Sequence, residues 1–490
     1  MPRREMKLRL SAEEELSADV AAGMRSIQSE LHVSPDFPAD VEATAAAAGT
    51  APRLPAADRT DLALVTIDPP TSRDLDQALH IARTEHGYLV SYAIADVAAF
   101  VSSGDAVDLE AHKRGESLYG AGSKIPLHPY VLSEGAASLL PDETRPALLW
   151  EIELDHQGRL AWEAGGALAE GVRVRRALVR SREKLDYAGV QQQLDSGTGS
   201  ESLTLLREVG QLREACERAR GGVSLPRAEQ EVVSEGGVWR LEFRRPLPVE
   251  GWNAQISLLT GFSGAALMIA GGVGLLRVLP APAERDVEAL RRIAVGLGLD
   301  WPKEQSYADF VRGLDPGQPH EAAMVTASTR LLRGSGYLAF TDGVPEDHLH
   351  SALAAPYAHL TAPLRRLVDR YASEIALAHS AGTPVPEWVL QALPDLPQTM
   401  REAARRASSY ERAVVDLVEA GLLRRRVGET FSAVIVAVEE RDPTRGMISL
   451  REPAVEAPIG AEVPLTLGAV VEVRLTLADV TKRAVAFRLA

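Results

Sequence analysis

A short apolar strand that two consecutive prolines stop is the feature that most constrains this chain. The run Leu62–Ile67 is apolar with β-branched members, which predicts a buried strand. Pro69 and Pro70 follow, and proline can neither donate a ladder hydrogen bond nor continue a strand. The strand is therefore expected to end at Asp68, where the chain must turn back.

Two further carboxylates follow in the turn. Asp74 and Asp76 flank Leu75, so extended backbone would place both carboxylates on one side and Leu75 on the other. With Asp68 they would crowd three like charges together, which favours a bound cation. Oxygen ligands without a His or Cys cluster favour magnesium or manganese, and such ions suit phosphodiester hydrolysis. By spacing alone, a solvated acidic loop is the simpler interpretation, since 68 of 490 residues are acidic.

The order of strands and helices predicts an α+β fold class with several domains. The chain has 490 residues, of which 46% are hydrophobic, enough for about two to four domains. Strands are predicted at 62–67, 88–94, 147–154 and 166–179, and helices at 286–297, 307–314, 322–332, 363–379 and 400–426. We divide the chain into a small helical module with a linker (1–60), a mixed strand-and-helix domain (61–426) and an all-β domain (427–490).

The first 60 residues predict two helices. Ser11 and Glu14 fit a capping box, and a second helix would run from near Pro38 to a C-cap at Gly49. The two helices would form either a helix-turn-helix-like RNA-binding unit or an ordinary packed pair. The N-terminus lacks an apolar core of secretory length, and the single cysteine, Cys216, fits a reducing compartment. We therefore expect a cytoplasmic protein.

One uncharged segment raises the question of a membrane. Residues 252–276 are long enough to cross a bilayer. Polar residues and glycines interrupt the segment, which favours a helix buried in a large domain. No association with a membrane is expected.

The stretch Ile67–Ala78, I-D-P-P-T-S-R-D-L-D-Q-A, resembles the active-site motif of the RNB family of 3′-to-5′ exoribonucleases, which includes RNase II and RNase R. Tyr92–Val97, Y-A-I-A-D-V, resembles the family's H-I-A-D-V, and Asp108–Pro129 matches a third family block. Tyr119 falls in that block where an aromatic residue contacts RNA near the scissile end. Alone, Tyr119 would be a half-buried packing residue; the resemblance implies a base or ribose contact.

A second strong motif lies far downstream. Tyr357–Asp369, Y-A-H-L-T-A-P-L-R-R-L-V-D, resembles the family's Y-A-H-F-T-S-P-I-R-R-Y-A-D. Pro363 predicts a helix start, which would place Arg365 and Arg366 in the first turn. The resemblance implies that Arg365 is the catalytic arginine, whose planar cationic fork suits a phosphate. By spacing alone, Arg365 would form an ion pair with Asp369.

The chain departs from the family pattern in three places. Gln77 stands where most of the family has a fourth aspartate, and an amide oxygen can ligate a metal but brings no charge. Ser257–Ala265 lacks the Glu and Asn that many relatives carry in the corresponding helix. The residues before Asp61 are too few for the paired cold-shock barrels of RNase II and RNase R, so RNA with a 3′ overhang is expected as a further substrate.

The last 60 residues predict a small barrel. Thr430–Val438, Val470–Leu475 and Val485–Leu489 alternate as short strands and resemble the RNA-binding OB barrel repeated in the largest small-subunit ribosomal protein. Phe431 is expected to contact RNA, because OB barrels stack bases on aromatic side chains. A generic barrel used for packing is the alternative.

The net charge of -15 is unusual for a protein that binds a polyanion. Positive charge is clustered in three islands, which are either solvated faces or parts of a basic internal path that focuses RNA. The islands are Arg173, Arg175, Arg176, Arg180, Arg182 and Lys184; Arg365, Arg366 and Arg370; and Arg424, Arg425 and Arg426.

Taken with the resemblance, these features predict a magnesium-dependent 3′-to-5′ exoribonuclease, in which manganese can substitute and nucleoside 5′-monophosphates are released from single-stranded RNA. A monomer is expected, with RNA as its partner. The alternative is a non-catalytic RNA-binding adaptor that keeps the RNB fold; a calcium loop is disfavoured because the required Gly and Glu positions are missing. The expected catalytic residues are Asp74, Asp76 and Arg365, the metal ligands Asp68, Asp74, Asp76 and Gln77, and the RNA contacts Tyr119, His359, Arg366 and Phe431.

Overall fold

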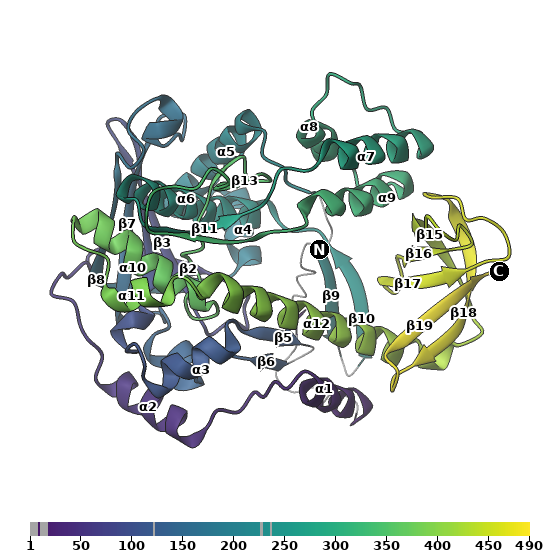
Figure 1. Cartoon of the computed structure of the whole chain (residues 1–490), viewed down its shortest axis with the longest axis horizontal. Coiled ribbons are helices and arrows are strands. Elements are labelled where there is room, and N and C mark those ends of the chain that lie inside the picture. Colours follow the sequence, from purple (N-terminus) through teal and green to yellow (C-terminus); the bar gives the residue numbers. More distant parts are fainter. Residues whose placement is uncertain (1–7, 10–17, 121–122, 226–228, 236–237) are drawn as a thin grey trace.

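The computed structural model describes residues 8–9, 18–120, 123–225, 229–235 and 238–490. These residues form two closed β-barrels that a long helix connects, α12 (Leu396–Leu423), with further helices around the first barrel (Figure 1). The predicted α+β class and the predicted C-terminal barrel are confirmed. The first barrel was not predicted as a barrel, because its closure depends on a pairing between strands that are distant in the sequence.

The first barrel has the strand order β2-β3-β4-β7-β8. It closes because β2 and β8 pair in parallel, with Ile67 beside Leu185. Helices α5 (Glu201–Arg220), α6 (Pro248–Gly271) and α10 (Leu367–Ala381) contact the strands β3, β7 and β8, and their side chains share one hydrophobic cluster with those strands. The strands are β2 (Leu64–Ile67), β3 (Gln77–Thr84), β4 (Gly87–Ala95), β7 (Thr144–Asp155) and β8 (Val172–Leu185).

The second barrel has the strand order β15-β16-β17-β19-β18 and packs against α12 and α9. Its inward-facing side chains and those of α12 belong to one hydrophobic cluster. The strands are β15 (Thr430–Val438), β16 (Arg445–Leu450), β17 (Val455–Gly460), β18 (Val470–Asp479) and β19 (Ala484–Leu489).

Helices and short sheets complete the molecule. The helices are α3 (Ala106–Arg114), α4 (Tyr187–Ser196), α5 (Glu201–Arg220), α6 (Pro248–Gly271), α7 (Glu284–Gly296), α8 (Tyr307–Arg312), α9 (Pro319–Ser328), α10 (Leu367–Ala381) and α11 (Glu387–Ala392). The short sheets are β1-β9-β10 (Leu8–Arg9, Glu229–Glu235, Val238–Arg244), β5-β6 (Leu118–Gly120, Ser123–Ile125), β11-β12 (Gly274–Val278, Gly336–Phe340) and β13-β14 (Leu349–His350, Ala355–Pro356).

The two N-terminal helices pack on different parts of the molecule. In α1 (Ala18–Glu30), Met24 and Ile27 join the cluster of α12 and the second barrel. In α2 (Ala39–Thr50), Val41 and Ala45 join a cluster of the first barrel. Figure 1 shows the extended stretch between them. The predicted C-cap at Gly49 was wrong, because the helix continues to Thr50; the expected capping box of Ser11 and Glu14 lies outside the described residues.

Helix α6 is long and apolar enough to span a membrane, yet its residues from Leu259 to Met268 are all buried. Its glycines allow close packing: a Cβ atom on Gly264 would lie 1.9 Å from a methyl group of Leu360. Phe262 meets the ring of Tyr357 edge-on at 5.8 Å. The predicted buried helix is therefore present, and it lies against the strand-and-turn region that carries the second motif.

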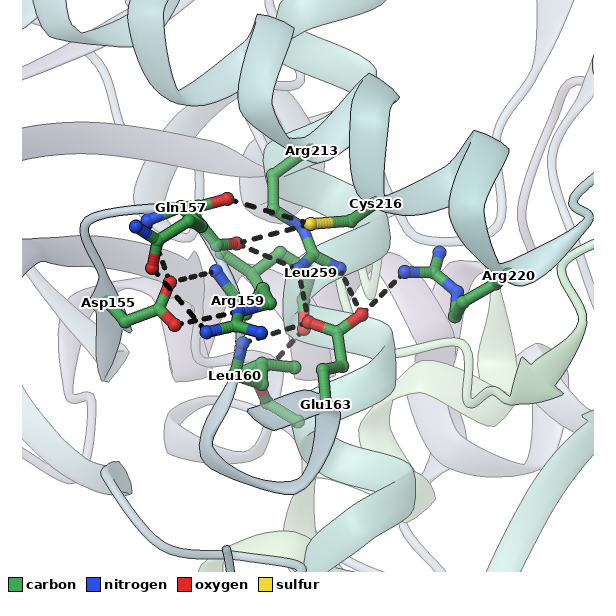
Figure 2. A network of polar contacts seen from close by, with 11 residues as sticks. Asp155, Gln157, Arg159, Leu160, Glu163, Arg213, Cys216, Arg220 and Leu259 are labelled. Carbon is green, nitrogen blue, oxygen red and sulfur yellow. Dashed lines mark hydrogen bonds and ion pairs between the residues drawn. The ribbon is translucent and has the colours of Figure 1, made fainter. Parts of the chain in front are cut away.

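A buried ion network fastens the connection between β7 and β8 to helix α5 (Figure 2). Arg213 of α5 is fully buried and donates to the carbonyl oxygen of Gly158 at 2.9 Å and to Glu163. Arg220, two turns along the helix, donates to the other oxygen of Glu163 at 2.5 Å. Glu163 also accepts from the amide of Leu160 at 2.8 Å. The carboxylate thus joins a loop to a helix in a largely buried region.

Candidate active site

The loop after β2 is tied to β8. The amide of Asp68 donates to the carbonyl oxygen of Leu185 at 3.1 Å. The amine of Lys184 donates to the carbonyl oxygens of Pro70 at 2.7 Å and Ser72 at 2.5 Å. Asp68 thus lies directly after the strand, as predicted. Burial, followed by the nearby charge of Asp74, raises the pKa of Asp68 to about 7.

Leu75 points into the core, while the flanking Asp74 and Asp76 contact polar groups of other segments. Leu75 is fully buried, and its amide donates to Ser138 at 2.9 Å. Asp76 is 5% exposed, and burial, together with the charge of Asp74, raises its pKa well above the ordinary value. Asp74 forms an ion pair with Lys124, at 2.7 Å between Oδ2 and Nζ. The three carboxylates are buried or half-buried and lie close enough to influence one another, so they are not a solvated loop.

The arginine of the second motif lies in a turn before α10. The helix begins at Leu367, so the predicted helix start at Pro363 was wrong and Arg365 belongs to the preceding turn. The amide of Leu364 donates to Oδ1 of Asp76 at 2.8 Å, and Nε of Arg365 lies 4.0 Å from Oδ2. The two motifs therefore meet at one carboxylate, and the Arg365 side chain, 37% exposed, remains accessible.

Contacts from three segments hold this turn. Gln77 donates its amide NH2 to the carbonyl oxygen of Thr361, and His128 hydrogen-bonds the backbone of Pro363. The amide of Ser117 donates to the carbonyl oxygen of Arg365 at 2.9 Å. Gln77 was predicted as a metal ligand; in the structure its NH2 group joins the aspartate motif to the arginine turn. His128 and Ser117 were missed, because nothing in their spacing indicates a distant partner.

Arg366 is paired within its own motif. Its guanidinium donates to both oxygens of the buried Asp369, at 2.9 and 2.8 Å. Asp369 also accepts from the amide of Ala362 at 2.7 Å. The alternative pairing of Arg365 with Asp369 is thus not the one that forms. Because its guanidinium donors bind Asp369, Arg366 stabilises the turn and is not positioned to bind a substrate.

Tyr119 and His359 both lie near the site. Tyr119 is on β5, where burial, followed by the charges of Asp74 and others, raises the pKa of its phenol. Nδ1 of His359 lies 2.7 Å from the hydroxyl of Tyr337. Burial, followed by the charge of Arg366, lowers the pKa of His359 well below its usual value, so the ring is neutral. Tyr119 adjoins the carboxylates, whereas His359 belongs to an aromatic group beside them.

Phe431 lies inside the second barrel. Its side chain is 6% exposed and meets Phe487 edge-on at 5.8 Å. The guanidinium of Arg426 covers the ring at 4.4 Å. This position favours the packing alternative for the barrel aromatics over a base-stacking platform.

Most of the basic side chains of the first two islands have partners in the fold. On β8, Arg175, Arg176 and Arg180 form ion pairs with carboxylates on neighbouring strands, loops or helices. Arg370 donates to the buried Asp108 at 2.6 Å. These cations therefore have partners within the fold, which neither the solvated-face nor the internal-path alternative anticipated.

Carboxylate oxygens, the donor type of this group, are the ligands that a hard divalent cation prefers. The group consists of carboxylate oxygens, and burial raises the pKa values of Asp68 and Asp76, as it does where negative charge lacks sufficient compensation. Across the described ranges, no three His, Cys, Asp or Glu side chains are grouped closely enough to hold a metal. Lys124 pairs with Asp74 within this carboxylate group, and no sequence signal marked that lysine.

Two family models match most of this chain. A family model described as the RNB domain matches residues 57–379, and one described as the RNase II-type exonuclease C-terminal S1 domain matches residues 429–490. Ribonuclease R of Escherichia coli is 27% identical over 409 residues, covering 78% of this chain and 48% of that protein. The chain therefore spans about half the length of this curated relative.

Solved structures share the fold. Mycoplasma genitalium RNase R, in complex with ribose-methylated single-stranded RNA, has a TM-score of 0.82 at 21% identity, covering 96% of this chain and 78% of that chain. Yeast Ssd1, described as a pseudonuclease, has a TM-score of 0.69 at 15% identity, covering 93% of this chain and 57% of that one. Because the RNB model covers more than half of the residues and both of its motifs meet at Asp76, this chain belongs to the RNB family.

Proposed function

We propose that this chain hydrolyses RNA from the 3′ end and releases nucleoside 5′-monophosphates with the help of magnesium, which manganese can replace. One observation carries the proposal. The buried carboxylate of Asp76 accepts from the amide of Leu364 and faces Arg365, so an acidic group and an accessible cation adjoin in one place. That pairing suits a phosphodiester, whose phosphate needs positive charge beside a site that activates water.

Each residue has a distinct role in this proposal. Asp68, Asp74 and Asp76 would hold the ion, which when bound would supply charge to the phosphate and lower the pKa of water. Arg365 would bind the phosphate with its planar fork. Tyr119 would contact the terminal nucleotide, and the Leu364 amide keeps the Asp76 carboxylate oriented. Gln77 would act chiefly by holding the arginine turn.

Single-stranded RNA is the proposed substrate, with the 2′-hydroxyl as the group that distinguishes it from DNA. RNA with a short 3′ overhang is a second proposed substrate. The first is supported by Mycoplasma genitalium RNase R, a protein of the same fold that has been solved in complex with ribose-methylated single-stranded RNA. Incubation of a duplex with 3′ overhangs of graded length would test the second, and stalling far from the duplex would contradict it.

A non-catalytic adaptor is the second candidate function. Gln77 brings no charge where most of the family has an aspartate, and Lys124 forms an ion pair with Asp74. One protein of the same fold is described as a pseudonuclease. Incubation of the purified chain with uniformly labelled RNA and magnesium separates the two candidates. We expect labelled monophosphates that vanish with EDTA and do not form from DNA; intact, protein-bound RNA would favour the adaptor.

A further inference from the structure

A lysine lies within the carboxylate group of the site. Lys124, on β6, places its ammonium nitrogen 2.7 Å from Oδ2 of Asp74 and 3.3 Å from Oε1 of Glu134. The side chains of Lys124 and Asp74 are only 16% and 14% exposed. An ion pair withdrawn from water to this degree is screened far less than a surface pair. The ammonium group of Lys124 therefore supplies Asp74 with a positive charge from within the protein.

Cationic side chains already lie beside the carboxylates of the site. Lys184 and Arg365 lie close enough to Asp68 to oppose the rise of its pKa, Lys124 pairs with Asp74, and Arg365 also faces Asp76. Three cationic side chains thus accompany three aspartates. Gln77, which follows Asp76, adds no charge and donates to Thr361. Each further cation in such a group meets repulsion from those present, which lowers the affinity for a second divalent ion.

The ligand geometry agrees with this charge balance. A pair of divalent ions in a phosphodiester site lies about 3.5–4 Å apart, so neighbouring carboxylates must serve both ions. In this chain one oxygen of Asp74 is occupied by the lysine amine and one oxygen of Asp76 by the Leu364 amide. These two contacts leave fewer carboxylate oxygens free to bind metal ions.

We propose that Lys124 takes the place of one divalent ion at Asp74, so that the remaining carboxylate oxygens hold a single ion. An ammonium group is a compact point charge with three donors, which suits it to replace a cation beside carboxylates. This inference rests on the metal site of the proposed function and specifies its occupancy. The lysine supplies a positive charge that is always present, whereas a second metal ion would have to be bound from solution.

Manganese binding to the full chain without RNA tests the proposal. Titration followed by electron paramagnetic resonance should count about one tightly bound ion per chain in the wild type and about two in Lys124→Met. Lys124→Arg, which keeps the charge, should stay at about one. Lys113→Met is the matched control, because Lys113 is an exposed lysine that pairs with Glu110 outside the site. An unchanged count in Lys124→Met, or no ion in either protein, would overturn the proposal.

A second measurement covers the case in which Lys124→Met does not fold. The wild-type count then decides, since two tightly held ions contradict the proposal and one supports it. Thermal melting adds a separate readout: manganese should raise the melting temperature of folded Lys124→Met by more than that of the wild type, because the variant lacks a cation at Asp74. These measurements contain no RNA, so they are independent of the RNA degradation assay. A failure to degrade RNA would refute the proposed function, while the ion count would still test the inference about Lys124.

Discussion

Nε of Arg365 lies 4.0 Å from Oδ2 of Asp76, and the amide of Leu364 binds the other oxygen of the same carboxylate at 2.8 Å. The two motifs that carry these residues come from distant parts of the chain. One buried carboxylate therefore joins them, and it does so through both a backbone donor and a cationic side chain. Activity at this site should therefore be lost when the contact between Asp76 and the Arg365 turn is disrupted, even where the protein stays folded.

Asp76→Asn should abolish RNA degradation while RNA binding persists. The amide oxygen can still accept from Leu364, so the turn should keep its position, but the charge that would hold a metal ion is lost. We expect the rate of monophosphate release to fall by at least about 1000-fold, measured under single-turnover conditions, with the RNA affinity within a few-fold. Asp61→Asn, an exposed aspartate beside Arg59, is the control, and near-normal turnover of Asp76→Asn would refute the site.

Arg365 and Arg366 should give opposite results when each is replaced by methionine. Arg365 is partly exposed and faces Asp76, so Arg365→Met should lose activity and keep its melting temperature. Arg366 forms a bidentate pair with the buried Asp369, so Arg366→Met should lose about 3–5 kcal/mol of stability because a buried carboxylate is left unpaired. Denaturant unfolding and RNA degradation measured on both variants would check this. Equal loss of stability in the two would contradict the assignment.

The sequence predicted this site better than it predicted the contacts that hold it. The proline stop after Ile67 and the alternation around Leu75 are local effects, and both placed the aspartates correctly. The alternative pairing of Arg365 with Asp369, suggested by spacing alone, assumed a helix that begins at Pro363. The helix begins later, and the neighbouring Arg366 takes that partner.

Contacts between distant segments left no local signal. The pair of Lys124 with Asp74 and the parallel pairing that closes the first barrel both arise from tertiary folding. Phe431 shows the same limit in the second barrel. Alternation placed it in a strand, but whether an aromatic side chain points inward or outward depends on the strand register.

The contribution of Asp68 to the stability of the metal-free protein should fall as the pH rises from about 4 to about 7. Asp68 has a pKa raised from 3.8 to about 7, so the folded state keeps a proton that the unfolded state releases across this window. Stability is then lost by at most about 1.4 kcal/mol per pH unit from this group. Melting temperatures of the wild type and Asp68→Asn in EDTA would show it, because the variant lacks this contribution.

Magnesium should reverse that trend, since it favours the ionised carboxylate of Asp68. The difference between the wild type and Asp68→Asn should therefore shrink as magnesium is added near pH 7. Identical pH profiles for the two proteins in EDTA would contradict the raised pKa.

Glu163→Gln should destabilise the protein by about 3–5 kcal/mol, because the buried Arg213 and the partly buried Arg220 would lose their carboxylate (Figure 2). Arg159→Gln is the matched control in the same loop, since its pair with Asp155 is exposed and should cost less than about 1 kcal/mol. Denaturant unfolding would measure both. Similar small losses in the two variants would show that the buried network contributes little.

Phe431→Ala should reduce stability rather than RNA affinity. The ring is buried against Phe487, so its removal leaves a cavity that should cost about 3–5 kcal/mol. Val470→Ala, at an exposed position of β18, is the control and should change stability by no more than about 0.5 kcal/mol. Unfolding and RNA binding would be measured on the same preparations at one salt concentration, because nucleic-acid affinity varies steeply with salt. A stable Phe431→Ala with affinity reduced tenfold or more would show instead that this ring reaches RNA, and the barrel would then have to open around it.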